Sequence, residues 1–213
     1  MANPRIPSAT VTRLVRYLRA LEDLDQRGVE RVSSEQLAEA AGVTAFQVRK
    51  DLSYFGSYGT RGVGYAVPFL KRELRQILGL DRRWRLAIVG MGRLGQALAD
   101  YPGFGERFAL VGFFDIDPAK IGQRVGAGVI EPLAALPQAV RARAIEIGLV
   151  TVPREAAQEV VNRLVQAGVR GILNFAPAVV ETPPGVWVES VDFLAGLARL
   201  TYFVTQEVEG EWI

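Results

Sequence analysis

Apolar residues near the start of the chain recur every three or four positions, the spacing of a helix with one buried face. They predict a first helix that ends before Gly28, with an inward face of Val11, Leu14, Val15, Leu18 and Leu21. Residues 33–36 match a capping box, in which a hydroxyl begins a helix and a glutamine three residues later reaches back to it. We expect a short second helix there, ended by Gly42.

Residues 44–47 match a second capping box and predict a third helix that runs to about Phe55. Its inward face would consist of Ala45, Val48, Leu52 and Phe55. Two short helices joined by a glycine-containing turn are typical of a helix–turn–helix, whose second helix enters the major groove of DNA.

The outward side of that third helix carries residue types that bind DNA. Arg and Gln side chains make paired hydrogen bonds to base edges, whereas Lys and Ser suit phosphates. The candidates are Thr44, Gln47, Arg49, Lys50, Ser53 and Tyr54. Thr44, Gln47 and Arg49 lie nearest the end of the helix that faces the bases, so they are the expected base readers. The alternative is a small helical domain that does not bind DNA. On a single helix, a charged face exposed to solvent would show the same pattern.

Four glycines in segment 56–65 predict a tight hairpin. Arg61, near its tip, would reach into the minor groove as the wing of a winged helix. A fourth helix is expected over 69–78, with Pro68 in its first turn and Gly79 at its end. We therefore expect a winged-helix DNA-binding domain over residues 1–80.

Beyond this boundary, short apolar strands alternate with helices. Continuous apolar runs, typical of parallel strands buried on both faces, occur at 86–89, 109–114, 145–152 and 169–175. Helical segments separate them at 93–101, 132–143 and 154–167. The alternation predicts an α/β fold with a Rossmann-like parallel sheet over residues 81–190. Residues 191–213 contain a largely apolar helix that would pack against something large.

A glycine motif, Gly90-Met91-Gly92-Arg93-Leu94-Gly95, directly follows the first of these strands and opens a helix. In such a dinucleotide site the first glycine allows a tight turn, the second admits the pyrophosphate, and the third lets helix and strand pack. The pyrophosphate lies at the helix N-terminus. Asp115 ends the next strand, where an acid binds the adenosine ribose hydroxyls; it would repel a 2′-phosphate and favour NAD(H) over NADP(H).

Two later loops would close over the cofactor at the ends of their strands. They are Thr151-Val152-Pro153 and Asn174-Phe175-Ala176-Pro177. Each residue in them fits an ordinary strand-to-helix turn equally well.

Composition narrows the possible functions. The chain has no histidine and no cysteine, which removes the commonest general base and the commonest metal ligands, so we expect no metal site. Catalysis would have to use Asp, Glu, Lys, Tyr or Arg, and we do not expect an enzyme. No apolar run reaches the length of a membrane span, and a cytoplasmic location fits. The net charge of +2 is unevenly distributed, with a positive excess in residues 1–80, which favours a polyanionic partner for the first domain.

Several segments resemble the Rex family of redox-sensing repressors. They are residues 43–56 and 62–65, the motif at 90–95, the strand end Phe114-Asp115 and the segment 174–177. The resemblance spans nearly the whole chain. It implies a homodimer that binds operator DNA, senses the NADH/NAD⁺ ratio and dissociates from DNA when NADH binds. It also implies a C-terminal helix that is domain-swapped between subunits.

The resemblance further implies a switch. In the family, an Asp that opens the last helix pairs with an Arg of the first helix in the DNA-binding form, and with a Tyr after the first Rossmann helix when NADH is bound. The matching residues here are Asp192, Arg19 and Tyr101, and Phe193 would lie beside the nicotinamide. Without the resemblance, Asp192 fits a plain helix N-cap.

Two other functions compete with this one. An NAD-dependent oxidoreductase with an N-terminal interaction domain is disfavoured because histidine is absent, no Tyr is followed four residues later by Lys, and no separate substrate domain is evident. A CoA- or nucleotide-binding structural module is disfavoured by Asp115, because its carboxylate would repel the 3′-phosphate on the ribose of CoA.

Overall fold

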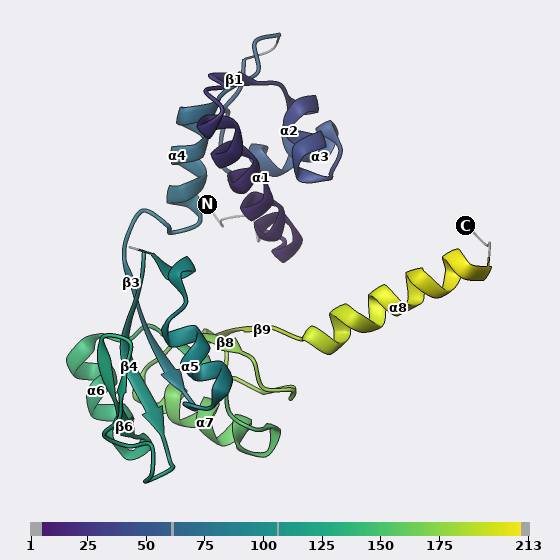
Figure 1. Cartoon of the computed structure of the whole chain (residues 1–213). Coiled ribbons are helices and arrows are strands. Elements are labelled where there is room, and N and C mark those ends of the chain that lie inside the picture. Colours follow the sequence, from purple (N-terminus) through teal and green to yellow (C-terminus); the bar gives the residue numbers. More distant parts are fainter. Residues whose placement is uncertain (1–5, 61, 106, 210–213) are drawn as a thin grey trace. The chain divides into compact units, whose positions relative to one another are not determined.

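The structure is a computed structural model that describes residues 6–60, 62–105 and 107–209. The chain divides into two compact units, Met1–Arg82 and Arg83–Ile213 (Figure 1). Each unit has a hydrophobic core of its own. Arg61, the expected wing residue, lies outside the described residues.

The first unit contains the four expected helices. They are α1 (Ser8–Gln26), α2 (Ser34–Ala41), α3 (Ala45–Ser53) and α4 (Val67–Ile77). Helix α1 packs against α2 and α4, and buried leucines from all four helices form the core. A two-stranded antiparallel sheet, β1 (Arg31–Val32) with β2 (Tyr65–Ala66), joins the segment before α2 to the segment before α4.

The two predicted capping boxes have different outcomes. At α2 the box is complete: Ser33 Oγ accepts a hydrogen bond from the Gln36 N–H at 3.2 Å, and Gln36 Oε1 accepts one from the Ser33 N–H at 2.9 Å. At α3 only half of it forms. Thr44 Oγ1 accepts from the Gln47 N–H at 3.2 Å, but the Gln47 side chain donates to Asp51 instead. The expected second box is therefore wrong, because a buried carboxylate competes for the glutamine.

The glycine-rich segment is a smaller hairpin than expected. A single bridge joins Thr60 to Gly64, and the next residues pair with β1, a strand too short to leave a periodic signal in the sequence. Gly64 has φ +80°, and a Cβ at this position would lie 2.5 Å from the Val32 carbonyl oxygen. This close approach of two main chains requires glycine.

The second unit is built on a seven-stranded sheet in the order β5-β6-β4-β3-β7-β8-β9, parallel except for β5 against β6. Its strands are β3 (Trp84–Val89), β4 (Phe108–Asp115), β5 (Arg124–Val125), β6 (Gly128–Pro132), β7 (Ile147–Val150), β8 (Gly171–Asn174) and β9 (Trp187–Ser190). The six parallel strands have the Rossmann order. Successive strands are added on one side of β3 as far as β6 and then on its other side from β7, so the strand order reverses between β3 and β7. Strands β5, β6 and β9 were not anticipated.

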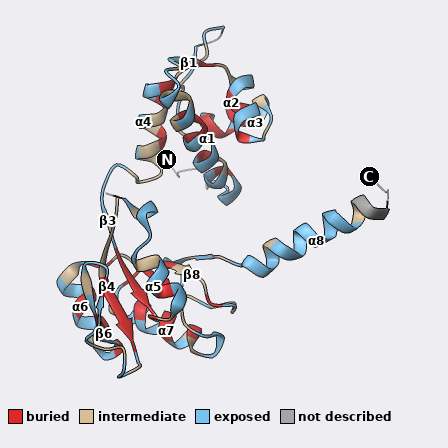
Figure 2. Ribbon diagram, viewed as in Figure 1, coloured by how far each residue is buried: buried red, intermediate tan, exposed pale blue. Residues whose placement is uncertain are grey.

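Helices cover both faces of this sheet, and the central strands are buried (Figure 2). The helices are α5 (Arg93–Ala99), α6 (Leu136–Arg143) and α7 (Arg154–Ala167), and the bounds of α7 are those predicted. Alternate residues of β3 serve opposite faces. Ala87 and Val89 join the core with α6 and α7, whereas Leu86 and Ile88 join the core on the α5 side.

The last helix, α8 (Phe193–Glu209), is apolar yet exposed in the single chain. Its exposed apolar side chains are Phe193, Leu194, Leu197, Leu200, Tyr202, Phe203 and Val204. An apolar surface of this extent marks an interaction site. Among the described residues, no helix has the length and apolar character needed to cross a bilayer.

A fully buried carboxylate joins α3 to α1. Asp51 accepts two hydrogen bonds from the Arg13 guanidinium, at 2.6 and 2.8 Å, one from the Tyr17 hydroxyl at 2.9 Å and one from Thr10 at 3.1 Å. Burial alone would raise the pKa of Asp51, but the hydrogen bonds from Arg13, Tyr17, Gln47 and Thr10 outweigh it and lower the pKa. Helix α3 is thus fixed to α1 by a buried ion pair.

We expect Asp51→Asn to lower the free energy of unfolding by about 3 kcal/mol near neutral pH, because the Arg13 guanidinium loses its counter-charge. The folded-state pKa of Asp51 lies below the unfolded value of about 3.9, so the ion pair stabilises fully above that pH. Its contribution is lost as the pH falls through the folded-state pKa. Urea unfolding at pH 7 and pH 3 should therefore show the gap between wild type and variant shrinking in acid. Asp23→Asn, at an exposed acid of α1, is the control and should leave stability unchanged at both pH values.

Candidate nucleotide and DNA sites

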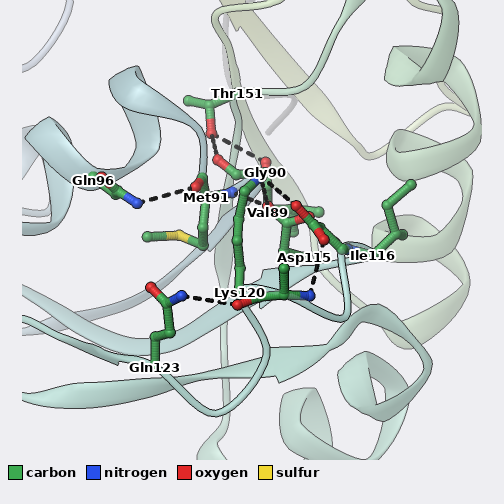
Figure 3. A network of polar contacts seen from close by, with 11 residues as sticks. Val89, Gly90, Met91, Gln96, Asp115, Ile116, Lys120, Gln123 and Thr151 are labelled. Atoms are coloured by element: carbon green, nitrogen blue, oxygen red, sulfur yellow. Dashed lines mark hydrogen bonds and ion pairs between the residues drawn. The ribbon is translucent and has the colours of Figure 1, made fainter.

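The glycine turn lies at the point where the strand order reverses. Strand β3 ends at Val89, and α5 begins at Arg93 with Gly92 as its N-cap and no side chain capping it. Thr151, directly after β7, holds the turn: its Oγ1 lies 2.7 Å from the Gly90 carbonyl oxygen and 3.1 Å from that of Val89 (Figure 3). Ligands of open α/β sheets bind at this position, beyond the carboxyl ends of the strands.

The three glycines of the motif have different physical roles. A Cβ on Gly95 would lie 2.2 Å from the Gly90 carbonyl oxygen, and one on Gly90, where φ is +100°, would lie 2.7 Å from the Thr151 carbonyl oxygen. Gly92 differs, because a Cβ there would meet nothing within 4 Å. Gly90 and Gly95 are thus required by the packing of the turn, and Gly92 borders the open space where a pyrophosphate would approach the N-terminus of α5.

Asp115 is nearly buried and has a complete set of donors. Its Oδ2 accepts from the Met91 N–H at 2.8 Å and from Lys120 Nζ at 3.1 Å, and its Oδ1 accepts from the N–H groups of Ile116 and Asp117 (Figure 3). Burial alone would raise the pKa of Asp115, but hydrogen bonds from Asp117, Lys120 and Met91 lower it, so the carboxylate stays ionised. A ribose hydroxyl must replace one of these donors, and the partly exposed Lys120 ammonium is the donor able to move.

Lys120 was not among the site residues expected from the sequence. Its ammonium lies against the acid that was expected to exclude a 2′-phosphate, so the charge at this end of the site is more balanced than Asp115 alone implied. The signal was present as a lysine five residues after the acid at the strand end.

The segment after β8 is shaped by its own asparagine. Asn174 is fully buried, and its amide donates to the carbonyl oxygens of Ala176 and Ala178 and accepts from the Ala176 N–H. Its side chain therefore folds the loop. Asn174 pairs with Val150 across β7 and β8, which places this loop beside the one that contains Thr151, Val152 and Pro153.

The remaining predicted cofactor contacts vary in exposure. Met91 is fully buried and faces the site with its main-chain N–H, whereas Arg93 and Leu94 are exposed in the first turn of α5. Phe175 is half-buried, Ala176 is buried and Pro177 is exposed.

In the second unit, the expected switch residues Asp192 and Tyr101 have separate partners. Asp192 Oδ1 accepts from the Ala195 N–H at 3.0 Å and so caps α8, while the exposed Tyr101 ring packs edge-on against Phe104. Arg19 is exposed on α1.

On α3, the outward face differs from the one expected. Gln47 donates to Asp51 at 2.8 Å and Thr44 caps the helix, so both side chains are engaged within the domain. Arg49 points outward and donates to Ser34 Oγ at 2.7 Å and Glu35 Oε1 at 3.2 Å; these exposed contacts are weak and leave it available to DNA.

The other expected contacts of α3 lie at its C-terminal half. Lys50 is exposed, Ser53 Oγ donates to the Lys50 carbonyl oxygen, and Tyr54 is half-buried at the C-cap. Arg49 and Ser53 line a groove whose other wall is the glycine-rich segment. Phe46, which was not among the expected contacts, is 66% exposed in the first turn of α3.

Comparison with known proteins places these features in a family. Residues 5–53 match the family described as putative DNA-binding protein N-terminus, and residues 81–178 match the CoA binding domain. The chain is 67% identical over 200 residues to the redox-sensing transcriptional repressor Rex of Thermus thermophilus, covering 94% of each protein. It is 50% identical to Rex of Deinococcus radiodurans, covering 93% of each.

The chain belongs to the Rex family. Its relatives of that name are redox-sensing transcriptional repressors, as the motifs had indicated, and neither of these two is named as an oxidoreductase. The Rex-family repressor RSP in complex with β-NAD⁺ and operator DNA is 37% identical, with a TM-score of 0.90 over 98% of this chain and 99% of that one. RSP in complex with β-NADH gives a TM-score of 0.87 over 95% and 96%. The predicted α/β fold, with an N-terminal DNA-binding domain and a C-terminal Rossmann-like domain built on a mostly parallel sheet, is confirmed.

The glycine roles are separable by experiment. We expect Gly95→Ala to lower the free energy of unfolding by about 2 kcal/mol, because the new methyl group meets the fixed Gly90 carbonyl oxygen. Gly92→Ala should cost less than about 1 kcal/mol, since only an N-cap preference changes. Thermal and urea unfolding followed by circular dichroism measure both. Equal destabilisation by the two variants would contradict the assignment of Gly92 to open space.

Proposed function

We propose that this chain is a transcriptional repressor that binds operator DNA as a homodimer and releases it when NADH occupies the second unit. The observation that carries this is the presence of both kinds of site in one chain. In the second unit, Gly92 borders open space where the strand order of the sheet reverses, next to a turn that Asp115 holds in place. In the first unit, Arg49 and Lys50 are exposed on a helix–turn–helix. The RSP complexes with β-NAD⁺ and operator DNA and with β-NADH support both halves of the proposal.

The residues around the turn suit a dinucleotide. Gly92 and the uncapped N-terminus of α5 would hold the pyrophosphate, and Asp115 would hold the adenosine ribose after exchange with Lys120. Thr151 and Asn174 shape the two loops at the neighbouring strand ends, and Val152, Phe175, Ala176 and Pro177 extend the wall of the site. The cofactors are therefore NADH and NAD⁺.

Release from DNA must arise from differential affinity, because a ligand shifts an equilibrium only toward the state that it binds better. The reduced nicotinamide ring is neutral and tolerates a closed apolar pocket beside Phe193. The oxidised ring is a cation, which costs free energy to desolvate there. Closure on NADH would change the spacing of the two recognition helices, which must match the half-sites of the operator.

The exposed apolar face of α8 is the basis for the dimer. Helices α6 and α7 pack on one face of the sheet and α5 packs on the other, so the α5 side has fewer covering helices than the α6 and α7 side. A helix exchanged from a second copy would bury its apolar side chains there. Asp192, at the start of that helix, would then alternate between Arg19 and Tyr101.

Fluorescence anisotropy of a labelled duplex tests the function directly. The duplex is selected from a random-sequence library by the protein itself, and binding is measured with no cofactor, with NAD⁺ and with NADH. We expect NADH alone to release the DNA, and the affinity to fall with rising salt as phosphate contacts by Arg49 and Lys50 require. Equal binding in saturating NADH and in its absence would refute the proposal.

Substitutions at Asp192 can separate its role as the N-cap of α8 from the effect of its negative charge. Asparagine caps a helix as well as aspartate does but carries no charge. If the charge operates the switch, Asp192→Asn and Asp192→Ala should both need about tenfold more NADH to release DNA, within the range of allosteric coupling energies. A cap-only role predicts that Asp192→Asn behaves as wild type, and that result would remove Asp192 from the switch.

A further inference from the structure

An aromatic side chain occupies the outward face of the recognition helix. Phe46 is the second residue of α3 and is 66% exposed, while Val48 and Leu52 fill the core on the opposite side. Phe46, Arg49, Lys50 and Ser53 are all exposed and follow the i, i+3, i+4, i+7 spacing of one helix face. Phe46 is thus the apolar member of a face that otherwise carries two cations and a hydroxyl.

The neighbours of Phe46 leave it facing the ligand. In the first turn of α3, Ala45 packs partly against the core, Gln47 turns back to the buried Asp51, and Thr44 caps the helix. The N-terminal residues of a recognition helix are those that contact base edges in the major groove. Phe46 therefore takes the place that Gln47 was expected to fill.

The charge of this face determines what can cover the ring. Arg49 and Lys50 lie one turn away on the same side, so a second copy of the face would be repelled, whereas a polyanion would be attracted. The major groove displays one apolar group, the 5-methyl of thymine, and phenylalanine is among the side chains that contact it. DNA therefore provides partners for both the two cations and the Phe46 ring.

We propose that Phe46 reads thymine in the operator by packing its ring against a thymine 5-methyl group in the major groove. This inference rests on the proposed binding of DNA by α3 and adds an apolar specificity determinant to it. Gln47 then acts on the position of the helix, through Asp51, and not on a base.

Replacing thymine by deoxyuridine removes the methyl group and nothing else, so it isolates the contact. On the duplex selected from a random library, each thymine is changed in turn to deoxyuridine and binding by the wild-type protein is measured by anisotropy. We expect one thymine in each half-site to lose about fourfold in affinity, the effect of one buried methyl group. Phe46→Ala removes the contact from both half-sites of the homodimer, so it should bind the thymine duplex about sixteenfold more weakly. It should not distinguish the two bases at that position.

Phe69→Ala is the matched control, because Phe69 is an exposed phenylalanine on α4 of the same unit. It should keep the full sensitivity to deoxyuridine, and Phe46→Leu should keep most of it. Melting curves check that each variant is folded, and the deoxyuridine series on wild type needs no variant at all.

Three outcomes would overturn the inference: a selected half-site without thymine, wild-type binding that no deoxyuridine weakens, or Phe46→Ala and deoxyuridine effects that add as independent changes. A wild-type protein that selects no duplex would instead refute the proposed function. The two failures are thus distinguishable.

Discussion

Ionised carboxylates that are buried and completely hydrogen-bonded hold both functional surfaces in place. Removing a carboxylate from water is costly unless charged and polar donors replace the lost hydration. Asp115 meets this condition with three main-chain N–H groups and Lys120, and so ties the glycine turn to the end of β4. Asp51 meets it with the Arg13 guanidinium and neighbouring donors, and so ties the recognition helix to α1.

In both units, several side chains that were expected to contact a ligand instead make hydrogen bonds within the protein. Gln47 serves Asp51, Asn174 folds its own loop, and Thr151 holds the glycine turn. What they leave free is more limited: the open space at Gly92, the exposed Arg49 and Lys50, and the ring of Phe46. A rigid support beneath a small number of exposed groups is the arrangement that keeps a binding geometry fixed.

Local signals in the sequence were sufficient for much of this fold. The Ser33 capping box, the bounds of α7 and the strand–turn–helix of the glycine motif each depend on residues close together in the chain. Two-residue strands such as β1 and β5 carry no period, and their existence depends on partners distant in sequence. The direction of the Gln47 side chain depends on the Asp51 carboxylate, which is buried by residues of α1. Phe46 was not expected to contact DNA because only polar residue types of the outward face were taken as candidates.

The saturation of Asp115 has a consequence for any sensor of a cofactor ratio. An adenosine ribose that binds there exchanges one hydrogen bond for another, since Lys120 must first leave the carboxylate. With the adenosine ribose at Asp115 as proposed, the half of the dinucleotide that is identical in both redox forms would be held with little net gain at this end. Discrimination between NADH and NAD⁺ then depends on the nicotinamide ring, whose charge changes with oxidation. The shared adenosine half contributes little affinity, so it does not reduce the difference in binding between the two forms.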